Sequence, residues 1–373
     1  MSDTQQRSDV LIVGGGLSGA AAAVLLARAG RGVHLLERQA EPAPKICGEF
    51  LSIEAQQHLA ALGIDLDRRG APRIGRIRVV WDGATVEPDL PFTARGLGRS
   101  ELDEALLDLA GAAGATIERG VRATHVVGSM VRTSAGERGG ATLLLATGKH
   151  RVREDGPPPK NPDGNAHAGF KMHWSLSPAD RQSLDGVIEL LLFPGGYAGL
   201  QMVSADTANL CVAIRKERLL GLGGRWEDVL AMMGTLSPAI RRLTDAQPLF
   251  ARPATIANLP YGHLHRGEED ESAYRLGDQA AMTASLTGDG MAIALRSAWL
   301  AARHIGEGVP PAVHHRRLRA MVHPQVKKAM VMQAMTENPL FGPLCRVILG
   351  HWPGILPHLV RATRLPEVDL CAA

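Results

Sequence analysis

The segment from Lys45 to Ser52, KICGEFLS, brings several chemically useful side chains together. Cys47 offers a thiol and Glu49 a carboxylate, and a lysine two residues before the thiol is a neighbour that can activate it. Cys47 suits three roles: an acid or redox partner, a packing residue against a bound ligand, or a small buried hydrophobic residue. Glu49 either orients the loop or a substrate hydroxyl, or is an exposed charge. Because rigid scaffolds often present chemistry on loops, Cys47 and Glu49 are candidate catalytic residues.

Two further candidates, His173 and Tyr197, lie in the middle of the chain. Tyr197 follows an apolar run and the turn Pro194–Gly196, where it could stack on a ring or donate its hydroxyl. A surface tyrosine packed on the turn is the alternative. His173 and Trp174 are neighbours on a predicted strand and therefore face opposite sides. We predict that His173 faces the cavity, with a purely structural histidine as the alternative.

The elements that would position these residues begin with a strand at 10–13, a glycine turn, a helix at 20–29 and a second strand at 32–37. The turn has the GxGxxG spacing in the context of a nucleotide site. Its glycines allow a tight turn, approach of the backbone to a pyrophosphate, and close packing of helix on strand. The free N–H groups of the helix would bind the phosphates, and Glu37 would bind a ribose hydroxyl. The predicted cofactor-binding residues here are Gly14, Gly16, Leu17, Ser18, Gly19 and Glu37.

A second glycine turn near the far end of the chain repeats this arrangement. A short strand at 273–276 ends at Gly277 and Asp278, and Gly288-Asp289-Gly290 precedes a predicted helix at 291–304. Backbone donors at this helix start suit a phosphate, and a carboxylate at the strand end suits a sugar hydroxyl. The predicted cofactor-binding residues of this second turn are Gly277, Asp278, Gly288, Gly290 and Met291.

These motifs resemble a flavoprotein family. GGGLSGAAAAVLLARAG with Glu37, and GDQAA with LTGDGMAIAL, are similar to the family of aromatic hydroxylases, flavin-dependent halogenases and geranylgeranyl reductases. PKICGEFLS, LLLATGKHRVRE and LLFPGGYAGLQMV resemble the geranylgeranyl reductase-like branch. The resemblance reaches to about residue 305 and implies FAD, with its ADP half at the first turn and its ribityl and ring end at the second.

The resemblance also implies cofactor contacts outside the two turns. Arg38 would touch the adenosine end, and Arg99 would lie against FAD, although Arg99 equally suits a helix start paired with Glu101 or Asp103. The other residues implied to bind the cofactor are Lys45, Cys47, Gly48 and Gly148.

The sequence departs from the family pattern at two places. Hydroxylases of this family carry an Asp-Gly pair at a strand end, whereas this chain has Thr147-Gly148-Lys149-His150. That departure leaves direct reduction of the flavin by NADPH or NADH open to question. An external electron donor is therefore a candidate beside these two cofactors. The tryptophan pair of halogenases is not found, because every tryptophan is isolated. Halogenation is therefore disfavoured.

The predicted fold class is α/β, with a Rossmann-type FAD-binding domain interleaved with a β-sheet substrate domain and a helical C-terminal segment. Proline-rich GPPPKNPDG, residues 156–164, is predicted to link the two bodies. The expected FAD-binding domain spans residues 1–75, 96–160 and 266–305. The expected substrate domain spans residues 76–95 and 161–265, and residues 306–373 form the expected helical cover.

The composition is that of a soluble globular protein. The 373 residues are 45% hydrophobic and 21% charged, with a net charge of +3 that gives nucleic-acid binding little support. The basic cluster at 314–319 is expected to be a solvated helix face. Four scattered cysteines suggest neither a metal site nor disulfides. Without a signal peptide or an apolar stretch of about twenty residues, we expect a cytoplasmic protein without stable membrane insertion.

The expected function is FAD-dependent redox chemistry on a small molecule that is aromatic or lipid-like. The C-terminal segment carries an apolar stripe at Phe341, Leu344 and 347–349 that would cover the cavity and favour a bulky apolar substrate. A monooxygenase ranks first, because that activity is the commonest in the wider family. A double-bond reductase or dehydrogenase of a prenyl or polyketide substrate is the alternative, and a flavin-binding protein without turnover ranks last.

Overall fold

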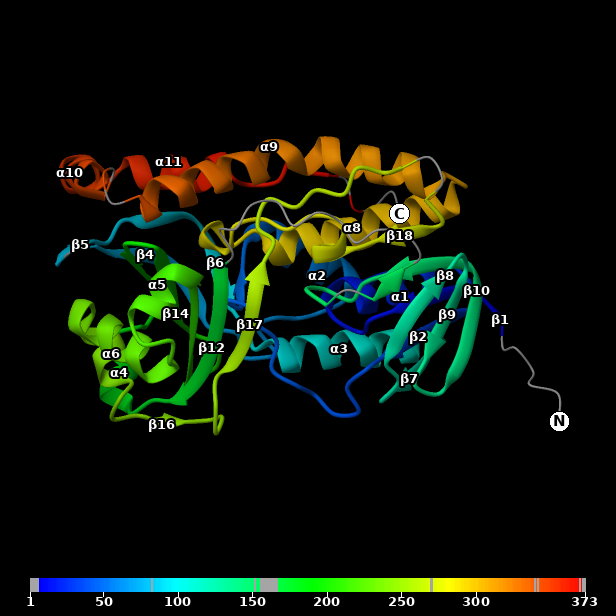
Figure 1. Ribbon diagram of the computed structural model, residues 1–373, viewed down its shortest axis with the longest axis horizontal. Helices are drawn as coiled ribbons and strands as arrows, with labels where there is room; N and C mark the ends of the chain where they lie inside the picture. Colours follow the sequence, from blue (N-terminus) through cyan, green and yellow to red (C-terminus); the bar gives the residue numbers. More distant parts are fainter. Residues whose placement is uncertain are drawn as a thin grey trace.

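The computed structural model describes residues 7–81, 83–150, 152–154, 167–268, 271–338, 340, 342–368 and 370. Two β-sheets lie side by side, with helices between and above them (Figure 1). The predicted fold class is confirmed: a nucleotide-binding α/β body is interleaved with a β-sheet body, and the C-terminal region is helical. The predicted linker at 156–164 lies outside the described residues.

The first sheet has the strand order β11-β8-β9-β10-β1-β2-β7, and β18 pairs with β10. Strands β1, β2, β10 and β18 run parallel, as expected of a nucleotide-binding sheet. Residues 10–13 of β1 are buried, which explains their unbroken apolar sequence. The strands are β1 (Arg7–Val13), β2 (Val33–Glu37), β7 (Thr116–Arg119), β8 (Ala123–Val127), β9 (Met130–Thr133), β10 (Gly136–Leu145), β11 (Arg153–Glu154) and β18 (Ala273–Arg275).

The second sheet has the order β16-β12-β15-β14-β13-β4-β6-β3, with β17 paired to β12 and β5 to β4. The chain enters this sheet twice, once between β2 and β7 and again between β11 and β18, so the two bodies are interleaved. Its strands are β3 (Phe50–Leu51), β4 (Arg73–Trp81), β5 (Ala84–Val86), β6 (Asp89–Gly96), β12 (His167–Ser175), β13 (Val187–Phe193), β14 (Gly196–Met202), β15 (Thr207–Arg215), β16 (Gln247–Pro248) and β17 (Ala254–Leu259).

The helices form the remaining layers. Helix α1 contacts both α3 and α8, and α9 runs along the top of the molecule, contacting α8, β13 and β14 (Figure 1). Helices α10 and α11 lie at one end, in contact with β5 and β6 respectively. The helices are α1 (Leu17–Arg28), α2 (Ile53–Leu62), α3 (Arg99–Ala112), α4 (Pro178–Gln182), α5 (Lys216–Gly221), α6 (Trp226–Leu236), α7 (Pro238–Arg242), α8 (Gly290–Gly306), α9 (Pro311–Glu337), α10 (Gly342–His351) and α11 (Ile355–Ala362).

Two local expectations are wrong. The basic cluster at 314–319 is not simply a solvated helix face: His314 and His315 are fully buried, while Arg316 and Arg317 are exposed. The first turns of α9 bury both histidines because they lie over β18 and the end of α8. The segment 45–51 is not loop throughout, since β3 pairs with β6.

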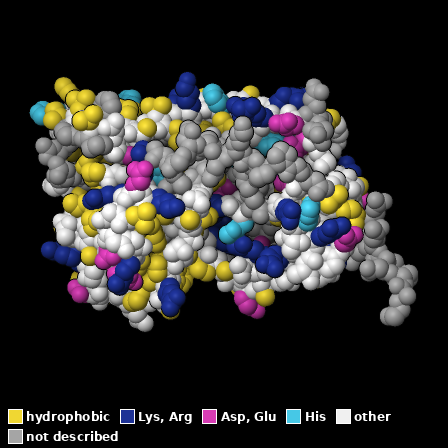
Figure 2. All heavy atoms as spheres, in the orientation of Figure 1, with side chains coloured by type: hydrophobic (Ala, Val, Ile, Leu, Met, Phe, Trp, Pro, Cys, Tyr) yellow, Lys and Arg dark blue, Asp and Glu magenta, His cyan; other side chains and the backbone are white. Residues whose placement is uncertain are grey.

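The outer surface is apolar at the end formed by α10 and α11, where Figure 2 shows hydrophobic side chains gathered. Leu344, Val347, Trp352 and Ile355 contribute exposed apolar area there. Phe341, which was assigned to the same stripe, lies outside the described residues. Among the residues that the structure describes, no helix combines the length and apolar character needed to cross a bilayer.

Candidate active site

The first glycine turn is built as a nucleotide cradle. Gly14 has φ of +109°, and a Cβ there would lie 2.4 Å from the carbonyl oxygen of Ala146 on the neighbouring strand. A Cβ on Gly19 would lie 1.9 Å from the carbonyl oxygen of Gly14, so only glycine lets α1 pack this close. Gly16 precedes α1, whose first N–H groups have no side-chain cap. The turn therefore presents free backbone donors, as a pyrophosphate requires.

The second glycine turn meets the first. Gly277 has φ of +56°, and a Cβ there would lie 2.9 Å from the Ser18 hydroxyl at the start of α1. The N–H of Gly277 donates to Ser297 Oγ of α8 at 2.8 Å, which fixes the turn against that helix. Gly288 also has a positive φ and lies against Phe50. The two turns, far apart in sequence, thus come together as predicted.

One cavity of about 450 Å³ adjoins both turns. Many predicted site residues line it: Gly16, Leu17, Ser18, Cys47, Gly48, Glu49, Arg99, Gly148, Tyr197, Asp278, Gly288, Gly290 and Met291. Gly14, Gly19 and Gly277 shape the turns behind it. The joint cradle fits FAD, because it combines open glycine backbone, an uncapped helix start and a cavity that adjoins both turns.

Away from the turns, the cavity continues into an apolar arm beneath the C-terminal helices. The arm crosses β4 and β13 and ends under α10 and α11. Its lining side chains are Ile77, Val79, Trp81, Ile188, Leu190, Leu192, Ile348, Leu349, Leu356 and Leu359. Such a lining favours an apolar ligand.

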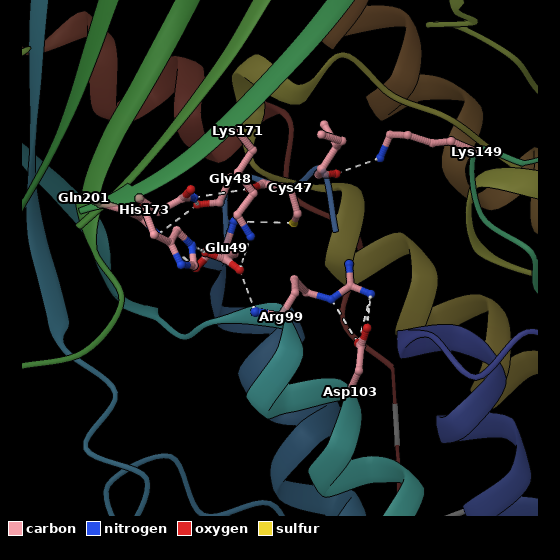
Figure 3. A network of polar contacts seen from close by, with 11 residues as sticks. Cys47, Gly48, Glu49, Arg99, Asp103, Lys149, Lys171, His173 and Gln201 are labelled. Carbon is pink, nitrogen blue, oxygen red and sulfur yellow. Dashed lines mark hydrogen bonds and ion pairs between the residues drawn. The ribbon is translucent and has the colours of Figure 1, made fainter. Parts of the chain in front are cut away.

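Glu49 lies at the centre of a buried polar network (Figure 3). Its Oε1 accepts a hydrogen bond from the backbone N–H of Arg99 at 2.6 Å and another from Lys171 Nζ. Its Oε2 lies 2.6 Å from His173 Nε2. Burial by itself would raise the pKa of this carboxyl, but the His173 hydrogen bond and the Lys171 charge outweigh it and lower the pKa. Glu49 is therefore an ionised, buried carboxylate that orients the loop, and the exposed alternative is wrong.

Side chains of the second sheet hold the backbone of the same loop. Gln201 of β14 donates to the carbonyl oxygens of Gly48 and Glu49, at 3.1 and 2.8 Å. Asn209 of β15 donates to those of Cys47 and Gly48, at 3.2 and 2.9 Å. The two side-chain amides thus hydrogen-bond the carbonyl groups of three consecutive residues, 47–49. The second sheet therefore helps to fix the position of the Cys47 thiol.

Cys47 lies where cationic side chains converge. Its Sγ accepts a hydrogen bond from the N–H of Glu49 at 3.3 Å. Burial opposes the charge of Arg99, but Asp103 and Cys47 outweigh it and raise the pKa of the guanidinium. Lys149 is half-buried, and although burial alone would lower the pKa of its ammonium group, Asp278 and Cys47 raise it. Both cations remain charged beside the thiol.

Arg99 has both features predicted for it, an ion pair at the start of a helix and a position beside the first glycine turn. Its guanidinium binds Asp103 in two places, at 2.9 and 3.0 Å, and would lie 3.6 Å from a Cβ on Gly16. It is thus a paired residue at a helix start that also faces the cofactor cradle. Lys149 lies 3.2 Å from Asp278 Oδ2 and donates to the carbonyl oxygen of Ile46, tying the second turn to the loop of Cys47.

The predicted adenosine end is separate from the large cavity. Glu37 accepts the N–H of Gly15 at 2.7 Å, and Lys45 Nζ lies 3.7 Å from its carboxylate. Both residues line a small hollow beside Gly15. Arg38 is exposed next to it. Lys45 is therefore near the adenosine end and not at the ring end.

The structure separates His173 from Tyr197. His173 contacts Glu49 and is not among the cavity-lining residues, so its expected place facing the cavity is wrong. Trp174 points the other way, into the core beside Trp226. Tyr197 is 4% exposed and lines the cavity, which excludes a surface position.

Several site residues were missed from the sequence. Lys171, Gln201 and Asn209 hold the loop, Lys149 pairs with Asp278, and Tyr261 lines the cavity. A signal existed for Lys171: Phe170, Met172 and Trp174 alternate with Lys171 and His173, so two polar groups share one strand face. The lone amides and Tyr261 carry no comparable pattern.

His265, Glu271 and His315 form a further cluster outside the cavity, with ligand-type atoms within 4.8 Å of one another. His265 Nε2 lies 2.5 Å from Glu271 Oε2, and Arg275 Nε donates to the other oxygen of Glu271 at 3.1 Å. Glu271 is thus already neutralised by an arginine. The contacts describe a hydrogen-bonded network under α9.

Comparison with known proteins supports the assignment of the two glycine turns to an FAD site. Residues 7–150 match the family described as FAD binding domain. Menaquinone reductase of Mycobacterium tuberculosis is 27% identical over 79% of this chain and 76% of its own. The Mycolicibacterium smegmatis protein of the same name is 34% identical, but the match covers only 38% of each chain. Digeranylgeranylglycerophospholipid reductase 2 of Methanosphaera stadtmanae is 27% identical over 78% of this chain and 75% of its own.

Other matches are shorter or structural. Squalene epoxidase 6 of Arabidopsis thaliana is 37% identical over 23% of this chain and 16% of its own. Among solved structures, the flavin-dependent brominase Bmp2 has a TM-score of 0.75 at 18% identity, covering 97% of this chain and 95% of its own. PqsL of Pseudomonas aeruginosa, described as a probable FAD-dependent monooxygenase, has a TM-score of 0.69 at 19% identity, covering 91% and 99%. These structures share the fold.

Proposed function

We propose that this chain, an FAD-dependent oxidoreductase whose residues 7–150 match the FAD binding domain family, reduces a carbon–carbon double bond in an isoprenoid substrate. The main observation behind this proposal is the free thiol of Cys47. It lines the cavity that extends from the two glycine turns into the apolar arm. The apolar arm has the character needed for a long hydrocarbon chain.

The relatives support the same substrate class. Menaquinone, digeranylgeranylglycerophospholipid and squalene, the compounds in their names, are all isoprenoids. The two reductases match over more than three quarters of this chain, whereas the epoxidase matches over less than a quarter. The long matches therefore favour reduction.

FAD supplies the electron pair for this reaction when it is bound in its reduced form. Reduction of the double bond places a hydride on one carbon and a proton on the other. Cys47 Sγ is the proton donor in this proposal, and a proton from solvent restores the thiol afterwards. Arg99 and Lys149 hold charge beside the thiol, and Glu49, Gln201 and Asn209 fix the loop. NADPH, NADH or an external donor would have to supply the two electrons that each turnover consumes.

Oxygen insertion into the same substrate class is the second candidate, favoured by the epoxidase match and by the same apolar arm. The thiol counts against it, since free thiols near a site of oxygen activation are oxidised to sulfenic acid. The two reactions differ in product mass and in their need for oxygen.

The test is a single-turnover assay with the FAD-loaded protein. The protein is reduced with dithionite under nitrogen and mixed with geranylgeraniol or squalene, which have no quinone ring that dithionite could reduce, and the products are analysed by mass spectrometry. We expect a product heavier by two hydrogens without oxygen. A product heavier by one oxygen, formed only in air, would establish the second candidate instead. No product under either condition would contradict both.

A further inference from the structure

The cavity carries one group of hydroxyls among its apolar side chains. Tyr197 comes from β14, Tyr261 from the turn after β17, and Ser285 from the turn at 285–287 that precedes Gly288. All three residues line the cavity. Three separate elements thus bring hydroxyl groups to one place, which we call the hydroxyl cluster.

The hydrogen bonding within the hydroxyl cluster is incomplete. Tyr261 Oη and Ser285 Oγ lie 2.6 Å apart, so one donates to the other. The Tyr197 hydroxyl lies near both and influences the pKa of Tyr261, but it is buried and makes no hydrogen bond of normal geometry with either of them. Leaving a buried hydroxyl unpaired costs on the order of 1–3 kcal/mol. A ligand that offers an acceptor there would recover that cost.

The chemistry of the hydroxyl cluster selects a neutral acceptor. Burial raises the pKa of Tyr197 well above 10 and also raises that of Tyr261, so both phenols stay protonated donors near neutral pH. The nearby cation Lys149 is already paired with Asp278 at 3.2 Å. A carbonyl or hydroxyl oxygen therefore fits the cluster better than a charged group does.

The position of the hydroxyl cluster suits the headgroup of a long ligand. Tyr261 is close enough to Lys149 to feel its charge, and Lys149 contacts the loop of Cys47. Tyr197 packs in the same apolar group as Trp81 and Leu356 of the apolar arm. The cluster thus lies between the ring end of the cofactor cradle and the arm.

We propose that Tyr197, Tyr261 and Ser285 form a subsite for a neutral oxygen of the substrate, so that the protein selects oxygenated isoprenoids over hydrocarbons of equal length. This inference rests on the proposed function for the isoprenoid class. Its physical basis, an unpaired buried donor beside a paired hydroxyl couple, is independent of the direction of the redox reaction.

The test compares two probes that differ in one oxygen. FAD-loaded protein is titrated with geranylgeraniol and with the hydrocarbon that lacks its hydroxyl, and binding is followed through the flavin absorbance spectrum. We expect the wild type to bind the alcohol about tenfold more tightly. Tyr197→Phe and Tyr261→Phe should each lose most of this preference, with hydrocarbon affinity unchanged.

The remaining tyrosine provides a matched control. Tyr274, whose hydroxyl donates to the carbonyl oxygen of Val309, does not line the cavity, so Tyr274→Phe should keep the preference. If Tyr197→Phe does not fold, Tyr261→Phe and Ser285→Ala carry the test. Equal affinity of the wild type for both probes, or equal weakening of both by the tyrosine variants, would overturn the subsite.

The outcomes separate the two proposals because binding is measured without turnover. An alcohol preference that depends on Tyr197, without conversion of any isoprenoid, would support the subsite and contradict the proposed function. If the protein reduces both probes and binds them with equal affinity, the proposed function is supported and the subsite is contradicted. Binding of neither probe would overturn both.

Discussion

At the scale of single residues, the two thiols that line the cavity differ in their surroundings. Cys47 and Cys211 both line the cavity, but Cys47 lies beside two charged cations and the cofactor cradle. Burial raises the pKa of the Cys211 thiol to about 12. Cys211 therefore holds its proton firmly, and in our proposal only Cys47 transfers one.

Replacement of Cys47 by alanine should separate binding from chemistry. We expect Cys47→Ala to retain FAD, because the glycine cradle and both helix starts are unchanged, but to lose turnover by about a hundredfold or more. FAD content from the absorbance spectrum and single-turnover rates are the measurements. Cys211→Ala is the control and should keep its rate within a fewfold. Unchanged turnover in Cys47→Ala would return this cysteine to a packing role.

At the scale of elements, the loop that carries Cys47 contacts both bodies. Its sequence follows the nucleotide-binding strand β2, but its charge partners lie on β12 and its backbone partners on β14 and β15. Lys171 and Glu49 are both essentially inaccessible to solvent. Loss of either charge leaves the other uncompensated in a medium of low polarity.

This buried pair predicts a strong coupling between distant residues. Lys171→Met should destabilise the protein by about 3–5 kcal/mol, because Glu49 would keep a buried charge. The double variant Glu49→Gln/Lys171→Met should lose clearly less than the sum of the single variants. Denaturant unfolding of the four proteins checks this. Simple additivity would mean that the pair contributes no interaction energy.

The sequence predicts much of this architecture from local patterns. The glycine spacing and flanking apolar runs place both turns, because only glycine satisfies the positive φ of Gly14 and Gly277 and the close approach at Gly19. The alternation in β12 reveals a polar strand face, but not that it faces Glu49. That partner is 122 residues away from Lys171, and only the packing of the loop against β12, β14 and β15 brings the two together.

At the scale of the whole molecule, the C-terminal segment closes the structure over the cavity. Arg364, just after α11, donates to the carbonyl oxygen of Thr287 at 2.6 Å and lies 2.8 Å from Asp289 Oδ1 at the start of α8. Its guanidinium also stacks over Phe92 of β6, 5.3 Å from the ring centre. One arginine thus joins the cover to both bodies. No sequence pattern indicated this contact.

Asp289 should make stability fall with rising pH. Burial raises the pKa of this carboxyl from 3.8 to about 6, despite Arg364. The folded state therefore holds the proton more tightly, and stability is lost as pH rises from about 4 through 6, by on the order of 3 kcal/mol. Asp289→Asn should lack this component. Thermal melts of the variant and wild type from pH 4 to 8 measure the difference.

The control is Asp245→Asn, which changes an exposed carboxylate. Its melting curve should follow that of the wild type at every pH. If Asp289→Asn does the same, burial of Asp289 does not set the pH dependence.

The separation of the two glycine turns along the chain bears on how the protein is made. The first glycine turn, up to Gly19, precedes the whole second sheet along the chain, whereas Gly277 to Met291 follow it. The nascent chain therefore carries only one half of the flavin site until the second sheet has been synthesised. A flavin that contacts both turns can therefore bind only after the second sheet has been synthesised.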